Sequence, residues 1–170
     1  MKILFFSDIH GVSDNLEYLK KLDKQENFDK VVCLGDIFSY SFFSDKENNI
    51  ILDFLKSFKD RLILIRGNCD YDLDIKYSSI VKMNIDDIDF GFTHGHLYNK
   101  DYNNVIDKGV LVYGHKHYPF IEEKDNVIYI CVGSISLPRN NSNPCYAIYK
   151  DKCITIYDIY GNIVDEIKLQ

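Results

Sequence analysis

The residues of this sequence that could bind a metal ion follow short apolar segments. Asp8 and His10 come directly after the apolar run at residues 3–6, on a loop that includes Gly11. The arrangement recurs along the chain, and all five histidines occur in such loops, namely His10, His94, His96, His115 and His117. Chance placement does not account for a pattern in which every histidine follows an apolar segment, so the sequence predicts a metal site.

Carboxylate, imidazole and amide groups make up the predicted ligand set. The seven candidates are Asp8, His10, Asp36, Asn68, His94, His115 and His117. Ligands of these types, without thiolates, suit Mn²⁺ first, with Zn²⁺, Fe²⁺ or Ni²⁺ as alternatives. Seven ligands are too many for one ion and fit two divalent ions per chain. Two ions that share a carboxylate can clamp a phosphoryl group and generate hydroxide at neutral pH.

The first 70 residues alternate between apolar strands and amphipathic helices. Strands are expected at residues 3–6, 30–34 and 61–65, with a helix after each of the first two. Asp14 and Glu17 predict a capping box at the start of the first helix. This order is typical of a parallel sheet covered by helices, with ligands bound at the carboxyl ends of its strands.

The second half of the chain is rich in short strands. These are expected at residues 80–83, 88–92, 110–113, 120–121, 127–132, 146–149, 154–157 and 163–169. Asp86-Asp87 and Asp151-Lys152 are the expected turns between neighbouring strands. A helical first half and a strand-rich second half predict two sheets packed face to face with helices outside, in a single domain of residues 1–170.

Composition excludes several classes of protein. The chain has 170 residues, 46% hydrophobic, and carries a formal net charge of −6, which argues against general nucleic-acid binding. The five cysteines are scattered without a C-x-x-C pair, as expected for reduced thiols in a cytoplasmic protein: Cys33, Cys69, Cys131, Cys145 and Cys153. No signal peptide or membrane span is expected.

Five motifs occur in an order that resembles a known family. They are Asp8-x-His10, Gly35-Asp36, Gly67-Asn68-Cys69-Asp70, Thr93-His94-Gly95-His96 and Gly114-His115-Lys116-His117. Together they resemble the calcineurin-like metallophosphoesterase superfamily, and within it the small YfcE-type phosphodiesterase branch. The stretch from Gly133 to Arg139 is similar to a segment of the same branch. The resemblance therefore extends over nearly the whole chain.

The resemblance implies an α/β four-layer α/β/β/α sandwich of two packed mixed sheets flanked by helices, with a dinuclear site. Carried over by motif, one ion is bound by Asp8, His10 and His117, and the second by Asn68, His94 and His115. Asp36 bridges the two ions. The implied activity is metal-dependent hydrolysis of a small phosphate ester, most simply a phosphodiester, by attack of a metal-bridging hydroxide.

Catalytic roles are expected for Asp36, Asn68 and His96, and contact with the substrate for Asn68, Cys69 and His96. Many members of the superfamily have histidine where this chain has Cys69, and a neutral thiol is a poor proton donor to a leaving group. His96 is a candidate phosphate contact or acid, and equally a residue that only supports the ligands or lies on the surface. Arg139 is expected to be solvated or structural.

Two further hypotheses come from other classes of protein. The retromer scaffold subunit has this fold with a degraded site and works by binding proteins, so a non-catalytic scaffold is the alternative to an enzyme. The third hypothesis is a metal-storage or sensing protein with one ion per chain. A homo-oligomer is also possible on this sequence. The aromatic loop from Tyr40 to Phe43 is a candidate oligomer contact or substrate wall, and equally a plain hydrophobic anchor.

Overall fold

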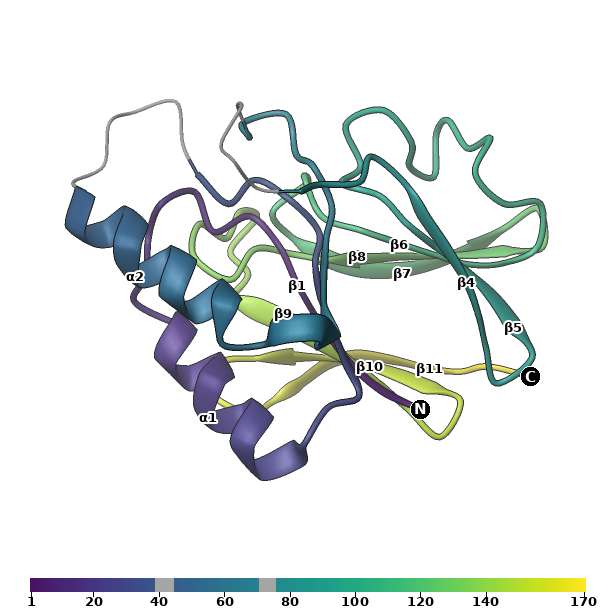
Figure 1. Ribbon diagram of the computed structural model, residues 1–170. Helices are drawn as coiled ribbons and strands as arrows, with labels where there is room; N and C mark the ends of the chain where they lie inside the picture. Colours follow the sequence, from purple (N-terminus) through teal and green to yellow (C-terminus); the bar gives the residue numbers. More distant parts are fainter. Residues whose placement is uncertain (39–44, 71–75) are drawn as a thin grey trace.

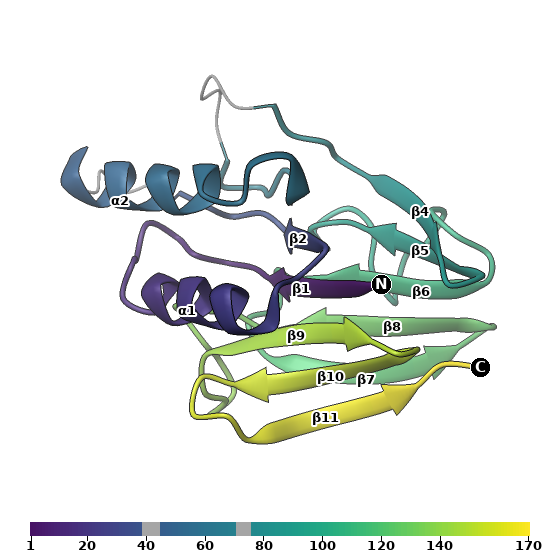
Figure 2. The ribbon, with the colours of Figure 1, turned by 60° about the horizontal axis from the view of Figure 1, so that its bottom comes forward.

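Two mixed β-sheets lie face to face in the computed structural model, which describes residues 1–38, 45–70 and 76–170. Figures 1 and 2 show the two sheets from directions 60° apart. The first sheet has the strand order β11-β10-β9-β1-β2-β3, with β1 (Lys2–Phe6), β2 (Lys30–Cys33), β3 (Leu62–Leu64), β9 (Cys145–Lys150), β10 (Cys153–Asp158) and β11 (Ile163–Lys168). The second has the order β4-β5-β6-β8-β7, with β4 (Val81–Ile85), β5 (Ile88–Phe92), β6 (Gly109–Tyr113), β7 (Pro119–Lys124) and β8 (Val127–Val132).

Each sheet contains a parallel group of three strands. In the first sheet β1 pairs in parallel with β2, and β2 with β3; in the second, β5 pairs in parallel with β6, and β6 with β8. All of these strands except β8 are apolar segments that the sequence places before its ligands. The carboxyl ends of each parallel group therefore lie at one edge of its sheet.

The main core lies between the sheets. Strand β1 alternates, with Ile3 and Phe5 in the core shared with the second sheet and Leu4 and Phe6 in the core beneath the helices. The rings of Phe5 and Phe92 meet edge to face across this interface, with their centroids 5.5 Å apart. Both faces of β1 are thus buried against apolar side chains. This explains why the strand is an unbroken apolar run from Ile3 to Phe6 in the sequence.

Helices α1 (Leu16–Glu26) and α2 (Asp45–Lys56) cover the outer face of the first sheet, and the short 3₁₀ helix η1 (Lys59–Arg61) follows them. Figure 1 shows both long helices on the side of β1 away from β6 and β8. The predicted capping box is wrong, because the N-cap of α1 is Asn15 and makes no side-chain capping bond. Instead the Asn15 amide donates to the Ile135 carbonyl at 2.7 Å, a tertiary contact that local sequence does not reveal.

An irregular segment, residues 97–108, covers the outer face of the second sheet. Val105 packs there against Leu111 and Tyr113 of β6 and Tyr129 of β8. The predicted sandwich of two packed mixed sheets is confirmed. Within the described residues the fourth layer is this irregular segment in place of a helix. None of the helices in the described chain is long and apolar enough to cross a membrane.

Tight two-residue turns join the antiparallel neighbours. Asp86 and Asp87 have φ angles of 51° and 67°, and Asp151 and Lys152 have 52° and 59°. Positive φ at both central residues is the type I′ geometry that matches the twist of a hairpin. Both turns that the sequence predicts are therefore confirmed.

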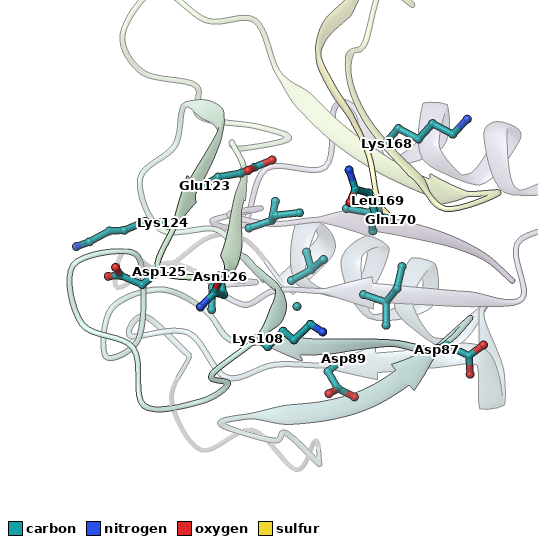
Figure 3. Close-up of a pocket in the computed structure, with 15 residues that line it drawn as sticks. Asp87, Asp89, Lys108, Glu123, Lys124, Asp125, Asn126, Lys168, Leu169 and Gln170 are labelled. Carbon is teal, nitrogen blue, oxygen red and sulfur yellow. The ribbon is translucent and has the colours of Figure 1, made fainter.

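A pocket of about 640 Å³ lies where β6 and β8 begin, close to the end of β11 (Figure 3). Its walls are apolar at Val110 and Ile128, and its rim carries charges of both signs, including Lys108 and Asp89. None of the predicted metal ligands lines this pocket. His115 and His117 follow the opposite end of β6, so the predicted chemistry and this pocket lie at opposite ends of the second sheet.

Replacement of Phe5 by alanine should lower the free energy of unfolding by about 3–5 kcal/mol, because a fully buried ring is removed from the core between the sheets. Chemical denaturation of the metal-free protein measures this loss. Tyr160→Ala is the control, since that ring is 71% exposed and its loss should change stability by less than about 0.5 kcal/mol. Equal effects of the two substitutions would contradict the packing described for Phe5.

Candidate metal centre

The loops that leave the parallel strands of both sheets meet at one place. In the first sheet, the backbone N–H of Asp8 donates to the Gly35 carbonyl at 3.0 Å, and that of His10 donates to the Asp36 carbonyl at 2.9 Å. A bond between the sheets joins this pair of loops to β6, because the His115 N–H donates to Asp8 Oδ2 at 2.9 Å. Ligands from both halves of the sequence are therefore fixed to one another by backbone contacts.

Five of the predicted ligands have left-handed backbone conformations. The φ angles are 57° at Asp8, 49° at His10, 52° at Asp36, 66° at His115 and 64° at His117. Non-glycine residues seldom adopt this region, and each such residue costs on the order of 1 kcal/mol. Such strain persists only where surrounding contacts enforce it, and it clusters at functional sites.

Asp8, His10 and His117 form one group of possible ligands. Asp8 Oδ1 lies 3.3 Å from His117 Nε2 and 3.7 Å from His10 Nε2. The Asp8 side chain is fully buried, and Oδ1 receives no hydrogen bond in the described structure. A buried carboxylate oxygen that faces two imidazole nitrogens and lacks a donor fits a bound cation, since an uncompensated buried charge is strongly unfavourable.

Asp36, His94 and His115 form a second group of possible ligands. Asp36 Oδ2 lies 3.3 Å from His94 Nε2, which also lies 3.1 Å from Asn68 Oδ1. The Asn68 oxygen therefore joins this group, as the sequence predicts. The structure thus brings six of the seven predicted ligands into two groups and places Asn68 beside the second.

The Asp36 carboxylate faces both groups. Its Oδ2 lies 3.3 Å from His94 Nε2 and 3.5 Å from His10 Nε2, so one oxygen is within reach of a ligand of each group. Burial opposes ionisation of this carboxyl, but the hydrogen bond and charge of His94, the Cys69 N–H and the charge of His10 outweigh it and hold the pKa well below its usual range. Asp36 therefore carries its negative charge at neutral pH.

Backbone carbonyls fix the orientation of two imidazoles. Nδ1 of His94 lies 2.8 Å from the Leu34 carbonyl oxygen, and Nδ1 of His117 lies 2.6 Å from that of Leu137. A carbonyl only accepts, so each Nδ1 carries the proton and donates it. This places Nε2 of both rings on the side of the carboxylates, which is the orientation that metal-binding histidines need.

Glycine is required where the loops approach most closely. A Cβ atom at Gly67 would overlap the Asp36 carboxylate, and one at Gly114 would lie 2.6 Å from Asp8 Oδ2. Both carboxylates that organise the site are thus covered by backbone without side chains. Larger residues at these positions would displace the carboxylates themselves.

Two supporting residues were not assigned roles from the sequence. The buried Asp70 carboxylate accepts from the backbone N–H groups of Asp36, Ile37 and Gly67 at 2.8–2.9 Å, and so holds the Asp36 loop. Ser134 Oγ donates to the Asp8 carbonyl at 2.8 Å and accepts from the Leu137 N–H at 2.7 Å. Asp70 ends the motif that begins at Gly67, and Ser134 lies in the stretch from Gly133 to Arg139. Their place in these motifs was the local signal in the sequence that they support the site.

His96 lies outside these groups of ligands. Its side chain is exposed, and its ring centroid is 5.3 Å from that of His94. Burial and the charge of His94 lower its pKa. His96 lines a pocket of about 370 Å³ that also includes Asn68 and Leu97, so it borders the space beside the second group.

The remaining predicted site residues lie around the same centre. Cys69 is 7% exposed, and its sulfur belongs to a third group of possible ligands with His10 and Asp36. Arg139 is exposed, and its backbone N–H donates to the His117 carbonyl at 2.9 Å, in line with a structural role. The aromatic loop from Tyr40 to Phe43 lies outside the described residues.

Residues 1–152 match the family model of the calcineurin-like phosphoesterase superfamily domain. The chain belongs to the calcineurin-like phosphoesterase superfamily. It is 26% identical over 167 residues to phosphodiesterase YfcE of Escherichia coli, covering 92% of this chain and 91% of that protein. It is 30% identical over 139 residues to phosphodiesterase MJ0936 of Methanocaldococcus jannaschii, covering 78% and 83%.

Two solved structures share the fold. The structure of E. coli YfcE, described as a phosphoesterase, has a TM-score of 0.89 at 23% identity and covers all of both chains. Vacuolar protein sorting 29 of Cryptosporidium parvum has a TM-score of 0.69 at 16% identity, covering 98% of this chain and 97% of that one. The predicted family and sandwich fold are confirmed by these comparisons.

The metal-free protein should lose stability as the pH falls from about 6.5 towards 4. Burial and the charge of His94 lower the pKa of His115 to about 4, and burial lowers that of His117. In this range the unfolded chain binds more protons than the folded chain, because its histidines titrate near pH 6.5. Denaturation of chelator-treated protein at several pH values measures the slope.

His115→Gln should make this slope shallower. His94 acts in the opposite direction, because its pKa is raised despite its burial, so the informative quantity is the difference between variant and wild type. His96→Gln is the matched control and should have the smaller effect, since His96 is more exposed. The interpretation of His115 fails if both variants retain the wild-type slope.

Proposed function

We propose that this protein is a metal-dependent phosphodiesterase with two divalent ions per chain. The observation that carries the proposal is the ionised Asp36 carboxylate, one oxygen of which faces imidazoles of two separate groups. The donor set is rich in oxygen and imidazole, which suits Mn²⁺ first and Zn²⁺, Fe²⁺ or Ni²⁺ as alternatives. Membership of the superfamily supports the same chemistry.

Each ligand is proposed from its contacts. Asp8, His10 and His117 hold the first ion, and the unbonded Asp8 oxygen is the strongest sign of that position. His94 and His115 hold the second ion together with Asn68, whose oxygen lies beside His94 Nε2. Asp36 is shared by the two. When bound, the ions supply Lewis-acid polarisation of the phosphoryl group and an activated water.

The residues at the open side of the centre are proposed to bind and orient the ester. Asn68 is exposed and borders the same pocket as His96, so its amide could reach a phosphoryl oxygen while its carbonyl oxygen, beside His94 Nε2, would hold the second ion. His96 is proposed as a phosphate contact or proton donor, and Cys69 as a neighbour of the substrate. Asp36, Asn68 and His96 are the proposed catalytic residues.

The proposed substrate is a small phosphodiester. The names of the two relatives described above, both phosphodiesterases, support a diester over a monoester. One domain over residues 1–170, a cytoplasmic location and a homo-oligomer stay predictions. None of the five cysteines forms a disulfide in the described structure, which supports a reducing compartment.

A scaffold without activity is the alternative function. Vacuolar protein sorting 29 has the same fold, but at 16% identity this likeness extends to the fold alone. A pure scaffold has no need for buried metal ligands with strained backbone that loops of both sheets bring together. A metal-storage protein with a single ion would need only one of the two groups. Metal analysis of the purified protein separates these possibilities.

Asp36→Asn should abolish hydrolysis and weaken the binding of both ions. Loss of residues that only support ligands lowers metal affinity or activity by about 10–100-fold, so loss of a shared ligand should lower turnover by more than about 100-fold. The assay strips the protein with chelator, restores Mn²⁺, and follows bis(4-nitrophenyl) phosphate and 4-nitrophenyl phosphate in parallel. The diester should be cleaved only with metal, and the monoester more slowly.

Asp89→Asn is the control, because this exposed carboxylate only accepts a bond from the Asn84 amide and should leave turnover unchanged. His115→Ala should abolish activity as Asp36→Asn does. Near-normal turnover in Asp36→Asn would contradict the assignment of Asp36 as a ligand shared by the two ions. Two bound ions per chain with neither ester cleaved would favour the scaffold.

A further inference from the structure

Cys69 lies within the metal centre and has no assigned part in holding an ion. One ligand atom each from His10, Asp36 and Cys69 lie within 4.8 Å of one another. We propose that the Cys69 thiolate is a further ligand of the ion held by His10 and Asp36, and that it biases this position towards softer divalent metals. The inference rests on the metal site of the proposed function.

Backbone contacts fix the sulfur relative to the carboxylate. The Cys69 N–H donates to Asp36 Oδ1 at 2.7 Å, while Asp36 Oδ2 faces the imidazoles of His10 and His94. The residue is 7% exposed, so its side chain is enclosed with the ligands and not directed into solvent. The three donors therefore lie close enough together to be ligands of one ion.

The Asn68 side chain contacts the sulfur. The Asn68 amide donates to Cys69 Sγ at 3.3 Å, so the sulfur lies beside a residue proposed to hold the second ion. On binding, the metal–sulfur bond forms and the S–H proton is released to solvent.

The other buried cysteines lack these features. Cys131 Sγ donates to the Gly114 carbonyl and Cys145 Sγ to the Asn143 carbonyl, as protonated thiols do. In the described chain, Cys69 is the cysteine that belongs to a group of possible metal ligands. Cys69 therefore differs from the other cysteines by its position next to the site.

A thiolate changes which ions this position prefers. Carboxylate and imidazole alone accept Mn²⁺ readily, whereas sulfur favours Zn²⁺, Co²⁺ or Cd²⁺ over Mn²⁺. The position held by His10 and Asp36 would then have a different preference from that held by His94 and His115. Mixed occupancy, with a softer ion at the first position, is the consequence for the protein.

Co²⁺ is the probe, because cobalt bound to thiolate gives a sulfur-to-metal charge-transfer band in the near ultraviolet that oxygen and nitrogen ligands do not give. Metal-stripped wild-type protein titrated with Co²⁺ should show this band, and Cys69→Ser should lose it. Cys153→Ser is the matched control for adventitious binding to a thiol, since Cys153 is a half-buried cysteine on β10, and it should retain the band.

Competition between Cd²⁺ and Mn²⁺ provides a second readout that does not depend on turnover. Cys69→Ser should lower Cd²⁺ affinity by at least about tenfold, because even indirect ligand partners change affinity by this much, and should leave Mn²⁺ affinity nearly unchanged. Cys69→Ala should behave in the same way if the sulfur, and not the shape of the residue, is responsible.

The outcomes separate the two proposals. Cobalt that binds with visible ligand-field bands, lost in Asp36→Asn, but without a sulfur band would overturn the Cys69 proposal and leave the metal centre intact. A sulfur band that persists in Cys69→Ser would also overturn it. Failure of the protein to bind cobalt at all would remove the metal centre of the proposed function together with this inference.

Discussion

Two buried carboxylates impose the constraint on which the site depends. Asp8 is fully buried and Asp36 is 2% exposed, and in the described residues the ion-pairing partners of both are imidazoles, with no lysine or arginine among them. A buried charge is tolerated only where hydrogen bonds and opposite charge compensate it. Backbone N–H groups of His115 and Cys69 each donate to one oxygen of these carboxylates. The other oxygens face the imidazoles, and that of Asp8 receives no hydrogen bond in the described structure.

The supporting structure follows from that constraint. Backbone can approach the carboxylates only without side chains, which explains Gly67 and Gly114, and only with left-handed turns, which explains the φ angles of the ligands. Asp70 then holds the turn at Asp36, and Ser134 holds the turn at Asp8. Both anchors act on the backbone, so they limit where the ligands can move without occupying the position of an ion.

The sequence predicted which polar residues lie together better than it predicted the contacts around them. Ligands after apolar strands could be recognised because the carboxyl ends of parallel strands meet at one edge, a rule that needs no tertiary knowledge. The bond of Asn15 to Ile135, which replaced the expected capping box, joins residues 120 positions apart, and local propensity contains no trace of it. The irregular layer over Leu111 and Tyr113 likewise depends on packing, because its sequence has no period of its own.

The pocket of about 640 Å³ and the candidate metal centre lie at opposite ends of this sandwich. The pocket beside Lys108 and Asp89 is the larger hollow, but its charges are exposed and mixed in sign, so water already compensates them. At the opposite end the carboxylates of Asp8 and Asp36 are buried from water. One oxygen of Asp8 receives no hydrogen bond there, so its negative charge is not fully compensated. A bound cation would stabilise the folded chain by removing this deficit and by holding the strained turns, so metal binding and folding are linked through the same residues.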